Sequence, residues 1–169
     1  MGSRSLFLAA DNLRHVQTEI AIRLAVAAAA GMAIGAEREI REQAAGLRTH
    51  ILVAVGSCLF TLVGIYGFDA FAGHQVARVD PSRVAAQIVT GIGFLGAGAI
   101  LRQGATIRGL TTAASLWIMA AIGMAVGVGM YWATGVAVVI TIVSLWLLRP
   151  IRRWLRRFAE THPPEEQLE

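Results

Sequence analysis

The chain has 169 residues, of which 56% are hydrophobic and 15% are charged. Soluble domains carry about 25% charged residues, so this composition excludes an ordinary soluble protein and indicates a single integral membrane domain. The formal net charge is +4 and all 15 basic residues are arginines, which we expect to set the orientation of the chain in a membrane and not to bind nucleic acid.

The first 19 residues have the pattern of an amphipathic segment. Leu6, Ala9, Leu13, Val16 and Ile20 recur near helical spacing, and the polar residues Arg4, Asp11, Arg14 and His15 lie at other positions. This pattern is typical of a helix that lies at a membrane interface. The apolar run over residues 6–10 is too short for the core of a signal peptide, so no cleaved leader is expected.

A first transmembrane helix is predicted over residues 20–36, where the only charge is Arg23. This side chain lies four residues after Glu19 and either snorkels to the headgroups, which we favour, or acts as a functional charge inside the membrane. Gly31 and Gly35 form a GxxxG pattern that permits close helix contact, and we expect this contact within the bundle and not at a dimer seam.

The polar residues 37–50 precede a second apolar helix, predicted over residues 51–68. The one cysteine, Cys58, lies in this helix, so we expect a small buried residue and no disulfide framework or site built from several cysteines. A loop is predicted over residues 69–79.

A third helix is predicted over residues 84–101, with its start marked by Asp80 and Pro81. Aspartate can cap the free backbone amides, and proline is tolerated in a first helical turn. Four glycines, at positions 91, 93, 96 and 98, would each cost a water-exposed helix about 1 kcal/mol. We expect close packing against other membrane helices to offset this cost.

Thr111 or Thr112 can cap a fourth helix that runs to Gly127, and the apolar residues that follow to Leu148 form a fifth. The stretch over residues 112–148 is nearly twice the roughly 20 residues that one crossing needs, so two helices are required. Gly127 and Gly129 mark the turn between them.

Arginine counts predict the orientation of these five crossings. Ten arginines fall on the side that holds the 37–50 loop, the 102–111 loop and the C-terminus, and four fall on the other side. We therefore predict an all-α integral membrane protein with five transmembrane helices, an outside N-terminus and a cytoplasmic C-terminus. Its parts are an interfacial segment (1–19), the transmembrane domain (20–148), and a basic juxtamembrane segment with a flexible tail (149–169).

The chain also contains a weak internal repeat. When residues 35–49 are compared with residues 98–112, five of 15 positions are identical. Both segments leave one helix and end in Gly-Leu-x-Thr before the next, so we predict a parallel duplication in which the first two helices correspond to the third and fourth.

Two long motifs resemble a known family. They are RLAVAAAAGMAIGAERE, followed by AGLRTHILVAVGSCLF, and RVAAQIVTGIGFLGAGAILRQGATIRGLTTAASLW. Together they look like the hydrophobic domain of the MgtC/SapB family of bacterial inner-membrane proteins, over nearly all of residues 20–148. The resemblance implies a role in adaptation to low magnesium or in the intracellular survival of pathogens. It also implies one of two activities: magnesium transport, or regulation of other membrane proteins such as ATP synthase or a transporter. Many members continue into a soluble C-terminal domain, so this chain is expected to be a short form.

The first candidate site is the acidic-basic-acidic run of Glu37, Arg38 and Glu39, which matches the family pattern. Paired carboxylates could bind Mg²⁺, which prefers oxygen ligands. The alternative, which we favour, is a solvated helix end with Arg38 and Glu42 as an i,i+4 pair. No other cofactor is expected.

The second candidate site combines two loop segments. Its residues are Gly46, Arg48, Thr49, His50, Arg108, Gly109, Thr111 and Thr112. Glycine turns and threonine caps explain much of this pattern. The functional alternative is that the two loops meet beneath the bundle and present an electropositive surface to an acidic partner or an anion. His50 is expected to be a hydrogen-bonded or interfacial residue.

Asp80 and Arg83 also match the family pattern, and capping of the third helix accounts for Asp80. Five arginines over residues 149–157 predict adhesion of the juxtamembrane segment to anionic lipids. The leading functional hypothesis is a non-enzymatic factor that acts through a membrane protein partner, and the alternative is a channel or transporter for Mg²⁺ or another ion. A homo-oligomer is compatible with the small-residue faces.

Overall fold

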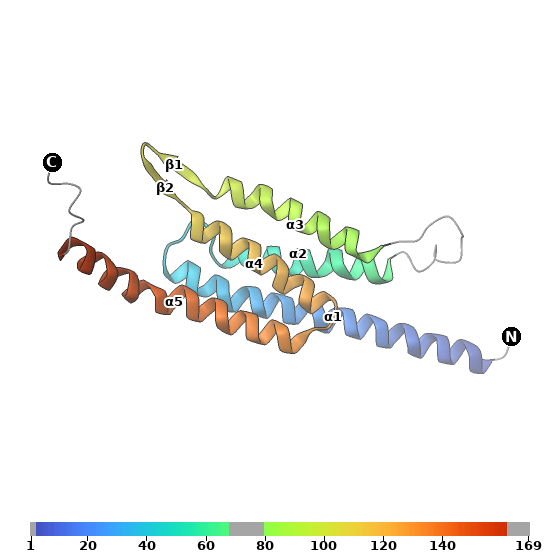
Figure 1. Ribbon diagram of the computed structural model, residues 1–169. Helices are drawn as coiled ribbons and strands as arrows, with labels where there is room; N and C mark the ends of the chain where they lie inside the picture. Colours follow the sequence, from blue (N-terminus) through green and yellow to red (C-terminus); the bar gives the residue numbers. More distant parts are fainter. Residues whose placement is uncertain (1–2, 68–79, 162–169) are drawn as a thin grey trace.

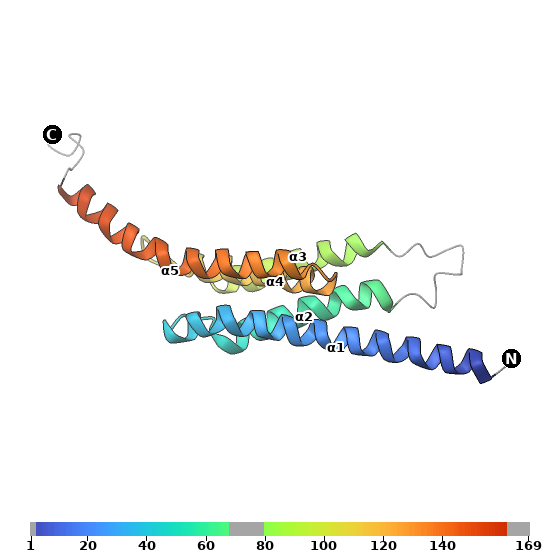
Figure 2. The same ribbon diagram turned by 90° about the horizontal axis from the view of Figure 1, so that it is seen from below.

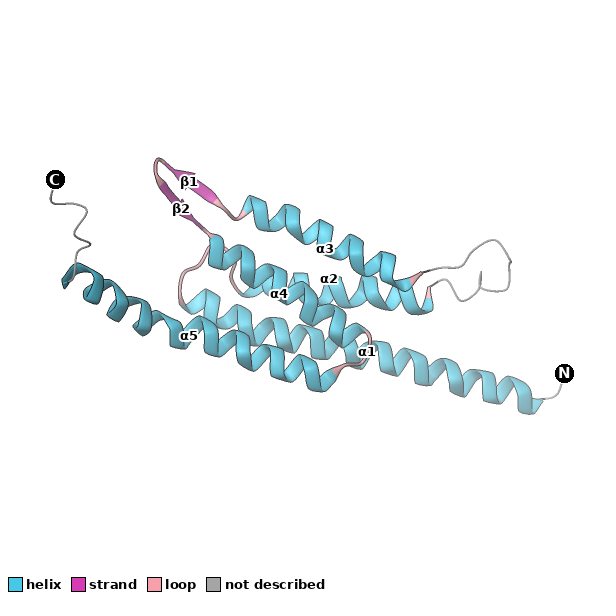
Figure 3. Ribbon diagram, in the orientation of Figure 1, coloured by secondary structure: helices cyan, strands magenta, loops and turns pink. Residues whose placement is uncertain are grey.

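The computed structural model describes residues 3–67 and 80–161, together with the side chains of residues 13–67, 80 and 82–147. This part of the chain contains five helices and one β-hairpin, which confirms the all-α class (Figures 1 and 3). In chain order the elements are α1 (Ser3–Ile40), α2 (Leu47–Tyr66), α3 (Pro81–Gly98), β1 (Leu101–Gln103), β2 (Thr106–Arg108), α4 (Leu110–Gly127) and α5 (Tyr131–Thr161). The predicted 69–79 loop and the flexible tail over residues 162–169 lie outside the described residues.

The helices run up and down alongside one another, with α4 in the middle. Helix α4 contacts each of the other four helices. The end of α1, the start of α2, the end of α3 and the start of α4 all lie at the end of the bundle from which the β-hairpin projects (Figures 1 and 2). We call this the hairpin end, and the other the opposite end.

Three stretches of helix are long and apolar enough to cross a membrane: Leu13–Ile40, Leu47–Tyr66 and Leu110–Gly127. The apolar stretch Tyr131–Leu147 in α5 is shorter. Large apolar side chains also face outward, including Phe94 at 81% and Trp132 at 86% exposure, as expected of a protein whose solvent is lipid. These features indicate a membrane protein, whereas five crossings, their orientation and the internal repeat stay predictions.

The core is built from small and aliphatic side chains where α1, α2 and α4 meet. Its members include Ala27, Ala30, Ile34, Ala54, Cys58, Leu62, Met119, Ile122 and Val126. Cys58 is fully buried, as predicted. Short side chains on all three helices bring the backbones close together, which is the usual means of packing helices in a membrane.

Two GxxxG patterns form the closest helix contacts. A Cβ atom added at Gly31 would lie 2.7 Å from Ile51 Cα, and one added at Gly35 would lie 2.8 Å from Leu47 Cα. The predicted contact of Gly31 and Gly35 within the bundle is therefore confirmed, with α2 as the partner. In α4, the pair Gly123 and Gly127 approaches α2 in the same way.

The glycines of α3 do not behave as predicted. A Cβ atom added at Gly91, Gly93 or Gly98 meets no described atom within 4 Å, and one at Gly96 lies 3.7 Å from Ala113 Cβ. Helix α3 stands at the edge of the bundle, where Ile92 is buried and most other positions are exposed. The packing prediction is wrong for Gly91, Gly93 and Gly98, because α3 has few helical neighbours.

The predicted N-terminal cap is confirmed for α3 and is wrong for α4. Asp80 caps α3 by accepting a 2.9 Å hydrogen bond from the Ser82 amide, as predicted, and hydrogen bonding to Ser82 lowers the pKa of the Asp80 carboxyl. At α4 the threonine cap is wrong. Gly109 holds the N-cap position with a φ of 87°, a left-handed conformation that glycine adopts without strain.

The first and last helices extend beyond their predicted transmembrane parts. Helix α1 is continuous from Ser3 to Ile40, so the predicted boundary between residues 19 and 20 is not a break; no proline interrupts this alanine-rich stretch, so nothing stops the helix there. Helix α5 likewise continues past residue 148 to Thr161, and Figure 2 shows it bending away from the bundle.

Arg23 joins α1 to the end of α4. Its Nε donates to Glu19 at 2.9 Å, and one terminal nitrogen donates to the Gly127 carbonyl at 2.7 Å. A cation at the C-terminus of a helix satisfies carbonyls that have no partner in the helix itself. The Glu19 partner agrees with the prediction, and the contact with Gly127 gives Arg23 a structural role at the opposite end.

Candidate functional site

The hairpin end brings several predicted site residues together. Glu37, Arg38 and Glu39 occupy the last turn of α1, Gly46 to His50 begin α2, and Thr112 begins the buried part of α4. Asp80 and Arg83 lie apart from them, at the opposite end, because they begin α3.

Arg38 is buried among polar partners. Its side chain has no exposed surface, one terminal nitrogen donates to Gln43 Oε1 at 2.7 Å, and the other lies 3.7 Å from Glu37 Oε2. Glu37 Oε1 is in turn 3.5 Å from Nε of Arg41, whose guanidinium lies 5.9 Å from the centre of the Trp146 ring. A chain of alternating charges therefore runs from the interior to α5, and the i,i+4 ion pair in it joins Glu37 to Arg41. Glu42 lies beyond the end of α1, with a φ of 53°. The prediction of a solvated helix end, with Arg38 and Glu42 as an i,i+4 pair, is wrong because Arg38 is fully buried.

Glu39 holds the start of α2. Its carboxylate accepts a 2.9 Å hydrogen bond from the Leu47 amide, eight residues later in the chain. A Cβ atom on Gly46 would collide with Oε2 of Glu39, so glycine leaves the room that this cap requires. The first free amide of α2 is thereby satisfied by a side chain from α1.

The carboxylates of Glu37 and Glu39 do not form a fitting Mg²⁺ site. Each is engaged by a different protein group, Glu37 with two arginines and Glu39 with the Leu47 amide. A divalent ion would have to displace these partners, and Mg²⁺ also retains several waters. Within the described residues, no group of three or more histidine, cysteine, aspartate or glutamate side chains could hold a metal ion.

His50 links the start of α2 to the start of α4. It is fully buried, with Nδ1 2.9 Å from the Gly46 carbonyl and Nε2 3.1 Å from Ser115 Oγ. The Ser115 hydroxyl donates to the Thr112 carbonyl at 2.8 Å. His50 is thus the hydrogen-bonded residue that we predicted. Its partner Ser115 was missed, since it lies 65 residues away in sequence.

The hydrogen bonds around His50 depend on the protonation state of its imidazole ring. The Gly46 carbonyl can only accept, so Nδ1 must carry a proton. While the Ser115 hydroxyl donates to Thr112, its oxygen can accept only from a protonated Nε2. With a neutral ring, the Ser115 hydroxyl would have to turn toward His50 and release the Thr112 carbonyl.

The predicted 102–111 loop is instead a β-hairpin. Strands β1 and β2 pair antiparallel, with Gln103 opposite Thr106, and Gly104 turns the chain with a φ of 60°. All residues from Leu101 to Arg108 are exposed. Glycine as the first residue of a two-residue turn is a known hairpin pattern, so the Gly104-Ala105 pair could have revealed this hairpin.

The hairpin is attached through a tight contact at Gly109. A Cβ atom on Gly109 would collide with the Ala99 carbonyl, so the two ends of the hairpin approach as closely as the backbones allow. Arg108 lies in β2 and Thr111 in the first turn of α4, both exposed. The contacts run from His50 and Ala45 to Ser115 and Leu116, which lie within α4. They do not include Arg108. The meeting of the two loops beneath the bundle stays a prediction.

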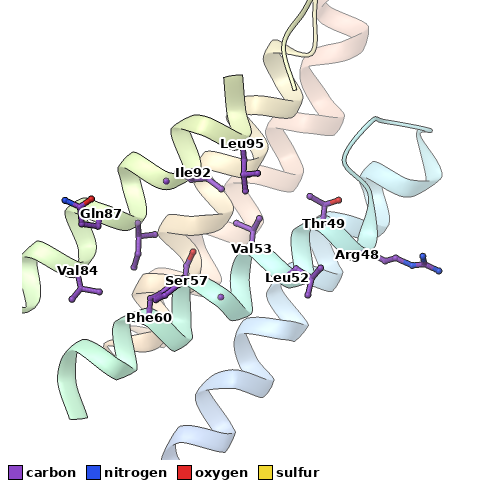
Figure 4. A pocket seen from close by; sticks show the side chains of 13 residues that line it. Arg48, Thr49, Leu52, Val53, Ser57, Phe60, Val84, Gln87, Ile92 and Leu95 are labelled. Atoms are coloured by element: carbon purple, nitrogen blue, oxygen red, sulfur yellow. The ribbon is translucent and has the colours of Figure 1, made fainter. Parts of the chain in front are cut away.

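A groove of about 610 Å³ lies between α2 and α3 (Figure 4). Apolar side chains form most of its walls, and Arg48 and Thr49 lie at its hairpin end. The other lining residues are Leu52, Val53, Gly56, Ser57, Phe60, Val84, Gln87, Ile88, Gly91, Ile92 and Leu95. A second hollow, of about 660 Å³, lies between α1 and α5 beside Glu37, Arg41 and Trp146.

Comparisons with known proteins agree on one family. A model of the MgtC family matches residues 24–154. "Putative magnesium transporter YhiD" of Escherichia coli K12 is 55% identical over 113 residues, which are 67% of this chain and 53% of that protein. Protein MgtC of Brucella abortus is 47% identical over 121 residues (72% and 48%), and protein SapB of Bacillus subtilis is 38% identical over 142 residues (81% and 61%). The chain thus spans about half the length of most such relatives. No solved structure matches the chain.

Proposed function

The chain belongs to the MgtC family, and from this membership we propose that it supports adaptation to low magnesium, or survival inside a host, by binding and modulating another membrane protein. In this proposal the chain crosses the bacterial inner membrane five times, with the hairpin end in the cytoplasm. It acts without enzymatic chemistry. Its partner is an ion-translocating membrane protein, such as ATP synthase or a transporter.

The observation that carries this proposal is the exposed β-hairpin over residues 101–108. Leu101 and Ile107 are 58% and 55% exposed, and Arg102 and Arg108 lie beside them. A short strand pair with free edges can add a strand from another chain. The arginines would favour an acidic partner and suppress basic ones.

The polar contacts beneath the hairpin support a fixed platform for such a partner. The His50–Ser115 hydrogen bond joins α2 to α4, and Glu39 joins α1 to α2. Gly109 then sets the hairpin directly against the end of α3. A surface whose base is rigid loses little conformational entropy on binding.

The alternative is a Mg²⁺ transporter, as the name of YhiD suggests for that protein. The middle of the bundle favours the partner hypothesis, because it is filled by apolar side chains such as Ile34, Met119 and Ile122. The buried charge of Arg38 and the partly buried charge of Arg23 lie near the two ends, each with acidic neighbours. A route for Mg²⁺ would need a succession of oxygen ligands along the membrane normal.

We expect the substitution Arg108→Glu to abolish function without loss of the protein. Charge reversal in the hairpin would set like charges against an acidic partner, which costs several kcal/mol and lowers affinity by more than about tenfold. The measurement is growth at limiting Mg²⁺ of a strain that lacks its own copy, with the amount of chain in the membrane fraction determined in parallel. Arg14→Glu, at an exposed arginine in the N-terminal half of α1, is the control and should support growth like the wild type. Full growth with Arg108→Glu would contradict the proposal.

A further inference from the structure

In the groove between α2 and α3, both helices face space that no described side chain fills. Gly56 in α2 and Gly91 in α3 both line it, and a Cβ atom added at either meets no described atom within 4 Å. Closer to the opposite end the two helices do touch, since a Cβ on Gly64 would lie 3.2 Å from Val84 Cγ2. The helices therefore diverge toward the hairpin end, and the groove between them has apolar walls.

Arg48 lies where this groove reaches the hairpin end. It is exposed and, among the side chains that the structure describes, makes no hydrogen bond or ion pair. In Figure 4 its side chain extends from the start of α2 and points away from α3. Arg48 and Thr49 belong to the first turn of α2. The Glu39 carboxylate already caps this helix start through the Leu47 amide, so Arg48 is the group left to attract a further anion.

The second hollow provides a contrast. Its arginine, Arg41, already has the Glu37 carboxylate at 3.5 Å and the Trp146 ring beneath it. The charge in that hollow is compensated within the protein. At the groove between α2 and α3, no acidic side chain that the structure describes pairs with Arg48.

We propose that this groove binds one anionic glycerophospholipid, with an acyl chain along the walls from Leu95 to Val84 and the phosphate at Arg48. An arginine suits phosphate because its planar fork can donate two parallel hydrogen bonds. The apolar walls suit a hydrocarbon chain, whereas a free anion would leave these walls unoccupied. The site is separate from the hairpin and does not depend on the partner hypothesis.

The test is lipid retention by the full chain, measured by native mass spectrometry. The protein is purified in detergent and equilibrated with equal amounts of phosphatidylglycerol and phosphatidylcholine. One basic residue near a lipid surface favours an anionic lipid by a factor of about five. We expect the wild type to retain one phosphatidylglycerol with about this preference, and Arg48→Gln to retain both lipids equally. Arg102→Gln removes the same charge at the same end, outside the groove, and should behave as wild type.

Two further variants test the hydrocarbon part of the site. Gly56→Leu and Gly91→Leu fill the groove from opposite walls, and each should cause a loss of retention of both lipids. Gly135→Leu is the control, since a Cβ on this glycine of α5 also meets no described atom within 4 Å. Thermal unfolding of each variant verifies that it is folded. Equal retention of the two lipids by the wild type, a loss of preference in Arg102→Gln, or unchanged retention in both filled variants would overturn the proposal.

Discussion

Gly123→Leu is expected to separate α4 from α2 and to destabilise the bundle by about 3 kcal/mol, the upper end of the usual cost of overpacking. A Cβ atom at this position would lie 2.9 Å from Ser57 Cβ and would collide with the Ala54 carbonyl. A backbone carbonyl within a helix cannot move aside, so the two helices must part. Because α4 contacts each of the other helices, the consequence extends to the whole bundle.

Cys58 offers a direct measurement of this separation. It is the only cysteine of the chain, and its side chain is fully buried in the core. Its thiol should resist a maleimide reagent in the folded wild type and react in Gly123→Leu, whose unfolding temperature in detergent should also fall. Gly135→Leu places the same side chain on an open helix face and should leave Cys58 protected. Protection of Cys58 in Gly123→Leu would show that α2 and α4 are not in the contact described.

Arg38→Met is expected to cost about 3–5 kcal/mol of unfolding free energy, because it removes one partner of a buried ion pair. The Arg38 side chain is 0% exposed and that of Glu37 is 9% exposed, so neither charge is well solvated. The substitution also removes the donor to Gln43 Oε1. In contrast, Arg41→Met affects a side chain that is 37% exposed and should cost about 0–1 kcal/mol.

A double-mutant cycle isolates the pair. Glu37→Gln combined with Arg38→Met removes both buried charges and leaves only the charge of Arg41, which is 37% exposed, so it should recover much of the stability that Arg38→Met loses. The free energy of unfolding is measured with a denaturing detergent in mixed micelles, and the loss of the helical circular dichroism signal reports unfolding. If Arg38→Met costs no more than Arg41→Met, the burial of Arg38 contributes nothing to the fold.

The parts of the fold that depend on neighbouring residues in sequence were predictable. Hydropathy and length indicated the helices, and the Asp80-Pro81 pair indicated the start of α3. Glycines show where this local reasoning ends. Gly31 and Gly35 pack against α2 as predicted, whereas Gly91 and Gly98 face open space. The two sets look alike in sequence, and only the position of each helix in the bundle distinguishes them.

The contacts of the candidate site join residues that lie farther apart in the sequence, so they were harder to predict. The caps and links that define it join Glu39 to Leu47 and His50 to Ser115, and no periodicity identifies such pairs. The sequence indicated that the two loops share one end of the bundle, since they follow helices of the same direction. It did not reveal which different partners Glu37 and Glu39 serve, although carboxylates two positions apart on a helix point to different sides.

Uptake of Mg²⁺ by liposomes that contain the purified chain tests the central claim most directly. A fluorescent Mg²⁺ indicator inside the liposomes reports entry, and protein-free liposomes give the background. A protein that acts through a partner should give the background rate, and Glu37→Gln and Glu39→Gln should give the same rate. Uptake above background that either substitution abolishes would contradict the partner hypothesis and establish the chain as a Mg²⁺ transporter.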